Sequence, residues 1–173
     1  MYLQGKKIQL RALEPEDLEF LFTTENDTAF WEVSHTQTPF SKFILKQYLE
    51  NSHVDIYEAK QLRLIVEDTK NKIPVGMIDV FDFNPQHKRA GIGVLINHQY
   101  QNSGFASEAL SLLIPYCFKI LNLHQLYANI TPDNEKSIAL FTGHGFEKTG
   151  EKKDWIFVNE NFKNELTFQL IHE

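Results

Sequence analysis

The residues best suited to chemistry lie in the short polar segment 101–106, Gln-Asn-Ser-Gly-Phe-Ala, between an apolar run and an amphipathic stretch. The apolar run 92–96 is typical of a buried strand, and apolar side chains recur at helical spacing from Ala106 to Cys117. A strand, a loop of small residues and a helix start leave several backbone N–H groups without partners, where the helix dipole favours negative charge. Gly104 lets a bulky anion approach the backbone. The segment therefore predicts a binding loop for a phosphate or pyrophosphate.

Two common phosphate-binding motifs are absent from the chain. No segment fits G-x-x-x-x-G-K-S/T or G-x-G-x-x-G. What remains is Q-x-x-G-x-A, which resembles the pyrophosphate-binding signature R/Q-x-x-G-x-G/A of the GNAT superfamily of acyl-CoA N-acyltransferases. A loop that only turns the chain into a helix has the same pattern, so six residues leave both interpretations open.

Further segments extend this resemblance over most of the chain, from about residue 8 to residue 157. After the predicted helix come a strand at 125–130, a helix start at Asn134 and a Gly-Phe exit at Gly145 and Phe146. Segments 10–13 and 15–18 resemble the opening strand and first helix of the family. Within the superfamily, the chain looks closest to the spermidine and ribosomal-protein-alanine N-acetyltransferase branches.

Length and composition limit the classes of protein. We expect one N-acetyltransferase domain over residues 1–173, because the chain has no linker, repeat or low-complexity tract. A net charge of −6 without a Lys/Arg cluster argues against a nucleic-acid partner. No apolar run approaches the ~20 residues that a spanning helix needs, and residues 1–7 do not look like a secretory signal. We therefore expect a cytoplasmic protein with no membrane partner.

The periodicities predict an α/β (α+β) fold. We expect a strand at 7–12, a helix that begins at Pro15, mostly loop at 25–40, and a second helix with a stripe of Phe43, Ile44, Tyr48 and Leu49. Strands at 62–66 and 75–83 form a hairpin, and a third antiparallel strand follows. The helix after the binding loop lets the strand at 125–130 run parallel to the one before it. With late strands near 155–158 and 165–171, the sheet is mixed and mostly antiparallel, with helices on both faces. The resemblance implies about seven strands and a V-shaped splay between the two parallel ones.

The resemblance also implies the position of acetyl-CoA, expected as co-substrate without any metal. The pantetheine would pair with Val94, Leu95 and Ile96, and a backbone N–H near Leu95 would polarise the thioester carbonyl. Asn134 would contact the pantetheine or a catalytic water, besides capping a helix, and Lys136 would meet a CoA phosphate. The pyrophosphate would lie on the loop and the following turn, with the contributing residues Gln101, Asn102, Ser103, Gly104, Phe105, Ala106 and Ser107.

The implied reaction is direct attack by a primary amine on the thioester in a ternary complex. Many relatives carry a Tyr general acid where this chain has Phe141, which has no proton to give. Three alternatives remain for the departing thiolate. It can leave unassisted, or it can take a proton from water or from another hydroxyl such as that of Tyr100 or Tyr127. This difference also keeps open the alternative of a catalytically silent acyl-CoA-binding module.

Carboxylates and aromatic residues supply candidates for the amine site. Asp79 and Asp82 interrupt an apolar strand, and both match acidic positions of the spermidine branch, as a water-linked base or as anchors for an ammonium. A regular strand puts them on opposite faces, whereas a bulge puts them on one face. An acid that polyamine relatives carry at the Gly91 position is missing. The loop at 25–40 adds further substrate-binding candidates that suit a cationic amine, namely Trp31, Glu32 and His35.

Other chemistries find little support in the chain. There is no H-E-x-x-H motif, no G-x-S-x-G motif, and Cys117 falls on an apolar helix face as a buried thiol. The expected partners are thus acetyl-CoA and an amine, which can be a polyamine, another small amine or a protein N-terminus. A homodimer or higher homo-oligomer stays open.

Overall fold

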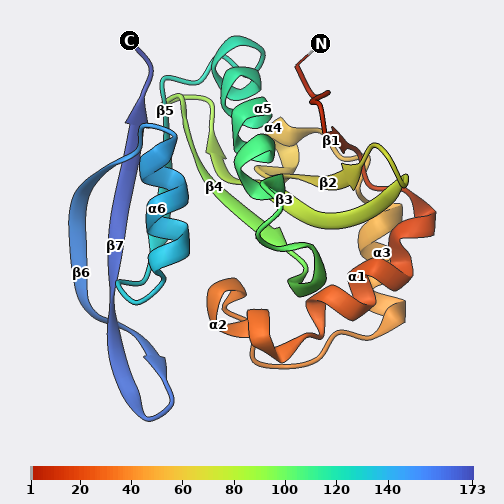
Figure 1. Ribbon diagram of the computed structural model, residues 1–173, viewed down its shortest axis with the longest axis horizontal. Coiled ribbons are helices and arrows are strands. Elements are labelled where there is room, and N and C mark those ends of the chain that lie inside the picture. Colours follow the sequence, from red (N-terminus) through yellow and green to blue (C-terminus); the bar gives the residue numbers. More distant parts are fainter. Residues whose placement is uncertain (1) are drawn as a thin grey trace.

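A seven-stranded sheet in the order β1-β2-β3-β4-β5-β7-β6 organises the computed structural model, which describes residues 2–173 (Figure 1). Neighbouring strands pair antiparallel except β4 and β5, which run parallel. The predicted mixed, mostly antiparallel sheet is confirmed. The strands are β1 (Ile8–Arg11), β2 (Leu62–Asp68), β3 (Ile73–Asn84), β4 (Arg89–Ile96), β5 (Gln125–Ile130), β6 (Glu147–Val158) and β7 (Asn161–Ile171).

Helices cover both faces of this sheet. The first helix begins at Pro15 as predicted, as one 3-10 turn that continues into α1. None of the helices within residues 2–173 is long and apolar enough to cross a bilayer. The helical elements are η1 (Pro15–Asp17), α1 (Leu18–Glu25), η2 (Thr28–Phe30), α2 (Trp31–Ser34), α3 (Lys42–Glu50), α4 (Ile56–Ala59), η3 (His98–Tyr100), α5 (Phe105–Lys119) and α6 (Glu135–Gly143).

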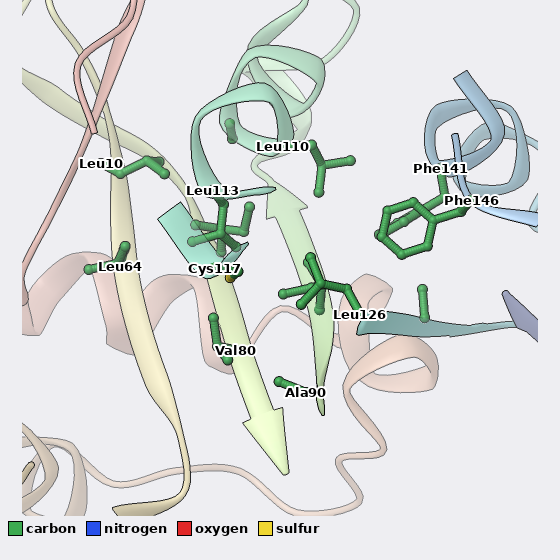
Figure 2. Packing of buried hydrophobic residues seen from close by; sticks show 14 of the residues in the cluster. Leu10, Leu64, Val80, Ala90, Leu110, Leu113, Cys117, Leu126, Phe141 and Phe146 are labelled. Carbon is green, nitrogen blue, oxygen red and sulfur yellow. The ribbon is translucent and has the colours of Figure 1, made fainter. Parts of the chain in front are cut away.

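Successive side chains of β2 and β3 point to opposite faces of the sheet, so the buried residues form two clusters. Ile65 and Met77 face α1 and α3, whereas their neighbours Leu64 and Ile78 join the larger cluster beneath α5. Figure 2 shows the α5 side chains, including Cys117, directed toward the sheet. The two faces of the sheet therefore meet different sets of helices.

The predicted splay is confirmed by the limits of strand pairing. β4 and β5 pair only at Arg89–Gln125, Ala90–Leu126 and Gly91–Tyr127, although β4 runs on to Ile96 and β5 to Ile130. Beyond these pairs the two strands leave a gap in the middle of the sheet.

Two expectations about the N-terminal third are wrong. The segment predicted as mostly loop contains η2 and α2, because Asp27 caps a turn that the apolar periodicity does not mark. In α3, Leu45 and Leu49 are buried, while Phe43 is 67% and Ile44 49% exposed. The helix and two residues of its expected stripe, Tyr48 and Leu49, are confirmed, whereas Leu45 takes the place of Phe43 and Ile44 on the buried face.

Candidate functional site

The loop between β4 and α5 carries a row of free backbone donors. Gly104 precedes α5 at φ +80°, and the first backbone N–H of the helix with a carbonyl partner is that of Glu108, bonded to Gly104 O at 3.1 Å. Within the part of the chain that the structure describes, the N–H groups of residues 102–107 have no backbone acceptor. Such a row of N–H groups at a helix start suits an anion with several oxygens. We call residues 101–107 the cradle.

A lysine that the sequence did not point to lies beside the cradle. The Nζ of Lys7 donates to Ser103 O at 3.1 Å, and lies 3.4 Å from where a Cβ on Gly104 would be. Glu108 of α5 fixes this approach, since its carboxylate accepts from the backbone N–H groups of Lys7 and Ile8, both at 2.8 Å. A positive charge thus stands next to the free N–H groups.

A cavity of about 680 Å³ connects the cradle with the other face of the sheet. Its lining includes Val94 and Ile96, on the α5 side, and Gly93 and Leu95, which point the other way, so it passes through the gap between β4 and β5. It contains most of the predicted site residues: Gln101, Asn102, Gly104, Phe105, Ala106, Ser107, Val94, Leu95, Ile96, Asn134, Lys136, Phe141, Asp79, Glu32 and His35. Ser103, Trp31 and Asp82 do not line it.

Along β4, the backbone N–H and C=O groups of every second residue face the gap, and those of the residues between them face β3. Asn97 donates to Val75 O at 2.9 Å, and a Cβ on Gly76 would meet Leu95 O at 2.2 Å, so the backbone groups of Leu95 face β3. Because these groups alternate along a strand, those of Val94 and Ile96 face the gap. The side chain of Gln101 donates to Ile96 O at 3.0 Å and holds the end of β4 against the cradle.

Residues of α6 form one wall of the cavity. Asn134 caps this helix, with its Oδ1 accepting from Ser137 N at 3.3 Å, as one of its two predicted roles requires. Phe141 is buried and packs edge-on against Phe146, with ring centres 5.1 Å apart. Of the two tyrosines considered as acids, Tyr100 lines the cavity and Tyr127 does not.

At the far face, an arginine holds two carboxylates together. Arg63 binds both oxygens of Asp79, at 2.7 and 3.0 Å, and also binds Glu25. Burial opposes the charge of Arg63, but the two carboxylates outweigh it and hold the pKa of its guanidinium well above the ordinary value. One cation against two anions leaves this network with a net negative charge.

Two more carboxylates line the same face. Glu32 binds Lys163 of β7 at 2.8 Å, and Lys163 also binds Asp133 at 2.6 Å. Glu165 of β7 is buried and lines the cavity. We call this part of the lining, made of Glu25, Glu32, Arg63, Asp79 and Glu165, the acidic end.

The remaining substrate candidates have other surroundings. Asp82 lies at a bulge in β3 with φ +47°, and its carboxylate is 3.4 Å from the Tyr127 hydroxyl, outside the cavity. The Trp31 indole donates to Glu25 O at 2.9 Å and so fixes the start of α2. His35 ends α2 in the left-handed conformation and lines the cavity.

Sequence reasoning missed Lys7, Arg63, Thr131 and Glu165 as parts of the cavity or its rim. Each comes from a different strand or strand end, so no local pattern connects them. The charge of Arg63 in an apolar run was the one available signal. Within residues 2–173, no three His, Cys, Asp or Glu side chains are grouped to hold a metal ion.

The chain resembles known proteins along most of its length. Residues 7–147 match the acetyltransferase (GNAT) domain family. The chain is 30% identical over 162 residues to spermidine N(1)-acetyltransferase of Escherichia coli, a match that covers 92% of this chain and 83% of that protein. A shorter match, 31% identical over 79 residues, covers 46% of this chain and 41% of the ribosomal protein uS5 alanine N-acetyltransferase of Escherichia coli.

Solved structures agree with these matches. The crystal structure of spermidine N-acetyltransferase from Vibrio cholerae in complex with CoA and spermine superposes with a TM-score of 0.86 and 27% identity, and 96% of each chain is covered. A dodecameric structure of spermidine N-acetyltransferase from the same organism gives a TM-score of 0.80 and 28% identity, and covers 96% of this chain and 95% of that one.

Proposed function

This chain belongs to the GNAT acetyltransferase family and is an acetyl-CoA-dependent N-acetyltransferase; from that premise we propose that it acetylates a small cationic amine, a polyamine first, by direct attack. The observation that carries the proposal is the cavity that joins an anion-binding cradle to an end lined by carboxylates. A polyamine is favoured over a protein N-terminus because the acidic end carries more negative than positive charge and the matched relatives named for spermidine cover most of the chain.

The chain offers acetyl-CoA a fitting surface at the cradle end. Free N–H groups, the left-handed Gly104 and the amino group of Lys7 suit the pyrophosphate, and Lys136 suits a further phosphate. The pantetheine then follows β4 from Ile96 toward Gly93, where the gap narrows. Since the backbone N–H of Leu95 faces β3, we assign the donor that polarises the thioester carbonyl to Val94, one residue from the predicted position.

The acidic end then receives the amine. The ammonium first loses one proton, because only the neutral nitrogen can attack. The nitrogen then forms a bond to the acetyl carbon and loses a second proton, while the C–S bond breaks and the departing thiolate takes up a proton. We assign acceptance of the first proton to Asp79, directly or through a water, because about a third of its side chain is exposed beside the gap. Arg63 occupies one site on each of its oxygens, so the remaining lone pairs are the ones that accept.

The chain has no tyrosine at position 141 that could protonate the departing thiolate, as we expect many relatives to have. Phe141 borders the cavity without a hydroxyl, so we propose that the thiolate leaves without a tyrosine at this position, with water or the Tyr100 hydroxyl as the proton source. Tyr100 is favoured over Tyr127 because only the former lines the cavity.

Release of CoA thiol in the presence of amines tests this function. The panel contains spermidine, simple diamines, monoamines, amino acids and peptides that begin with Ala or Ser, and mass spectrometry identifies the acetylated product. We expect spermidine or a diamine to give the highest kcat/KM. Thiol release no faster than hydrolysis with every amine, while acetyl-CoA still raises the Tm, would favour a silent acyl-CoA-binding module instead.

We also propose that the protein forms a homo-oligomer. The β6–β7 hairpin carries three aromatic side chains that are more than half exposed, Trp155, Phe157 and Phe162. Its tip extends beyond the rest of the sheet (Figure 1). Exposed apolar clusters of this kind favour association, and one structural relative is a dodecamer.

A further inference from the structure

The carboxylates of the acidic end differ in whether the protein supplies them with a cation. Glu25 and Asp79 share Arg63, and Glu32 binds Lys163. Glu165 is 5% exposed, and its carboxylate makes no hydrogen bond or ion pair within residues 2–173. Lys152 stands opposite Glu165 in the β6–β7 ladder, but its amino group lies over the Trp155 ring, 4.3 Å from the ring centre. A largely buried carboxylate without a partner is unfavourable, so Glu165 is suited to a cation that comes from outside the chain.

The position of Glu165 directs it into the cavity. Leu166 and Phe168 point into the core beneath α6, so by alternation Glu165 belongs to the opposite face of β7. It lines the cavity together with Ile156 of β6 and Thr131. The side chain thus faces the cavity from the sheet, at the acidic end.

A second buried polar group lies next to it. The hydroxyl of Thr131 is fully buried and lies near the carboxylate of Asp133, whose pKa it helps to lower, so its oxygen still has lone pairs that can accept. Ile130 pairs with Leu166 in the β5–β7 ladder, so Thr131 and Glu165 adjoin at its end. A carboxylate and a hydroxyl oxygen side by side accept hydrogen bonds from a group that only donates, which is the character of an ammonium.

This site is displaced from the gap where the reaction would occur. β5 lies between β7 and the gap, so Glu165 is one strand removed from it. A carboxylate also stabilises the charged form of an amine, which is unreactive toward a thioester. Resting on the function proposed above, we propose that Glu165, with Thr131, binds a second ammonium of the acceptor, one that stays protonated while another nitrogen reacts.

Two amine acceptors with the same four-carbon chain test the role of Glu165. 1,4-Diaminobutane carries two ammonium groups and butylamine carries one. In Glu165→Gln we expect kcat/KM for the diamine to fall about 10-fold or more, through KM, and kcat/KM for butylamine to stay within about 2-fold. Glu147→Gln, an exposed carboxylate on the adjacent strand β6, serves as the control and should change neither value.

Two further readouts separate this proposal from a structural role and from failure of the proposed function. Calorimetric titration of 1,4-diaminobutane into the CoA complex should show binding that Glu165→Gln weakens, whether or not acetyl transfer occurs. The Tm without amine should stay close to that of the wild type, because Glu165 makes no hydrogen bond or ion pair within the described residues that the variant could break. Equal losses for both amines, unchanged diamine binding or a lower Tm would overturn the proposal. Absence of transfer by the wild type, with diamine binding that depends on Glu165, would reject only the proposed function.

Discussion

Among single residues, Gly104 gives the cradle both a left-handed backbone conformation and open space for a ligand. Its φ of +80° belongs to the left-handed region, and a Cβ there would point toward the Lys7 amino group at 3.4 Å. Gly104→Val should therefore raise the Kd for acetyl-CoA by about 10-fold or more, and cost about 1–2 kcal/mol of stability. Calorimetry and thermal unfolding measure the two effects.

Gly145 provides a matched control for the backbone strain. It has φ +90°, lies after α6 and does not line the cavity. Gly145→Val should lower the stability in the same way and leave the affinity for acetyl-CoA unchanged. If Gly104→Val binds acetyl-CoA as the wild type does, the cradle does not hold the pyrophosphate.

Phe141 is the residue at which we expect the chemistry of this chain to depart from its family. Phe141→Tyr puts a hydroxyl at the cavity wall beside the proposed thiolate. We expect kcat to rise, by up to about 100-fold, with the Kd for acetyl-CoA unchanged, because a positioned acid assists the leaving group. Steady-state kinetics with the best amine of the panel measures this. An unchanged kcat would show that thiolate protonation does not limit turnover.

At the scale of elements, α5 has a cradle at one end and a buried thiol on its inner face. Burial raises the pKa of the Cys117 thiol to about 12, so at pH 8 hardly any thiolate is present. We expect iodoacetamide to alkylate Cys117 about 10³-fold more slowly in the folded protein than in the unfolded chain, as followed by mass spectrometry. Alkylation of the folded protein at the unfolded rate would contradict the packing of α5.

The raised pKa of the Cys117 thiol also predicts that the free energy of unfolding falls at alkaline pH. The pKa of the thiol in the folded state lies above that of the unfolded chain, which is about 8.5. The unfolded state therefore loses the proton first, and the contribution of Cys117 to the free energy of unfolding falls as pH rises from about 9 to 12. A Cys117→Ala variant should lack this part of the pH dependence.

The helices and strands whose apolar residues recur with a clear period could be predicted from the sequence. The hairpin of β2 and β3, the strand β4 and the helix α5 follow from alternation, polar turns and helical periodicity. The short helices η2 and α2 could not, because three- and four-residue helices contain no full apolar period. Their position over the acidic end depends on contacts such as Trp31 with the backbone of Glu25.

The candidate site was predictable where it consists of consecutive backbone groups, and less so where side chains from distant segments meet. The cradle is contiguous, so its motif is visible in six residues. The acidic end unites Glu25, Arg63 and Asp79 from three elements, and Glu165 looks like any outward polar residue of an alternating strand. Only the order of strands reveals that the cavity covers this part of β7.

At the scale of the whole molecule, the splay places two chemically different surfaces at one cavity. Free N–H groups and lysines lie at the α5 side, and carboxylates lie at the opposite face. An anionic and a cationic ligand can then approach the gap from different sides without competing for one surface. This separation favours a ternary complex.

The β6–β7 hairpin gives the whole molecule an exposed aromatic end. We expect sedimentation velocity to show an assembly larger than the 20.2 kDa chain, and Phe157→Glu to shift it toward smaller species, because a charge opposes apolar contact. Phe43→Glu on α3 is the control, since Phe43 is equally exposed but lies outside the hairpin. A monomer at every concentration would contradict the proposed homo-oligomer.

Initial velocities show whether the amine attacks directly while acetyl-CoA is bound beside it. Acetyl-CoA and the best amine of the panel are varied together with the wild-type protein, and reciprocal velocity is plotted against reciprocal concentration. We expect lines that intersect, because both ligands occupy the cavity before the acetyl group moves. Parallel lines, the pattern of an acetylated enzyme intermediate, would contradict it.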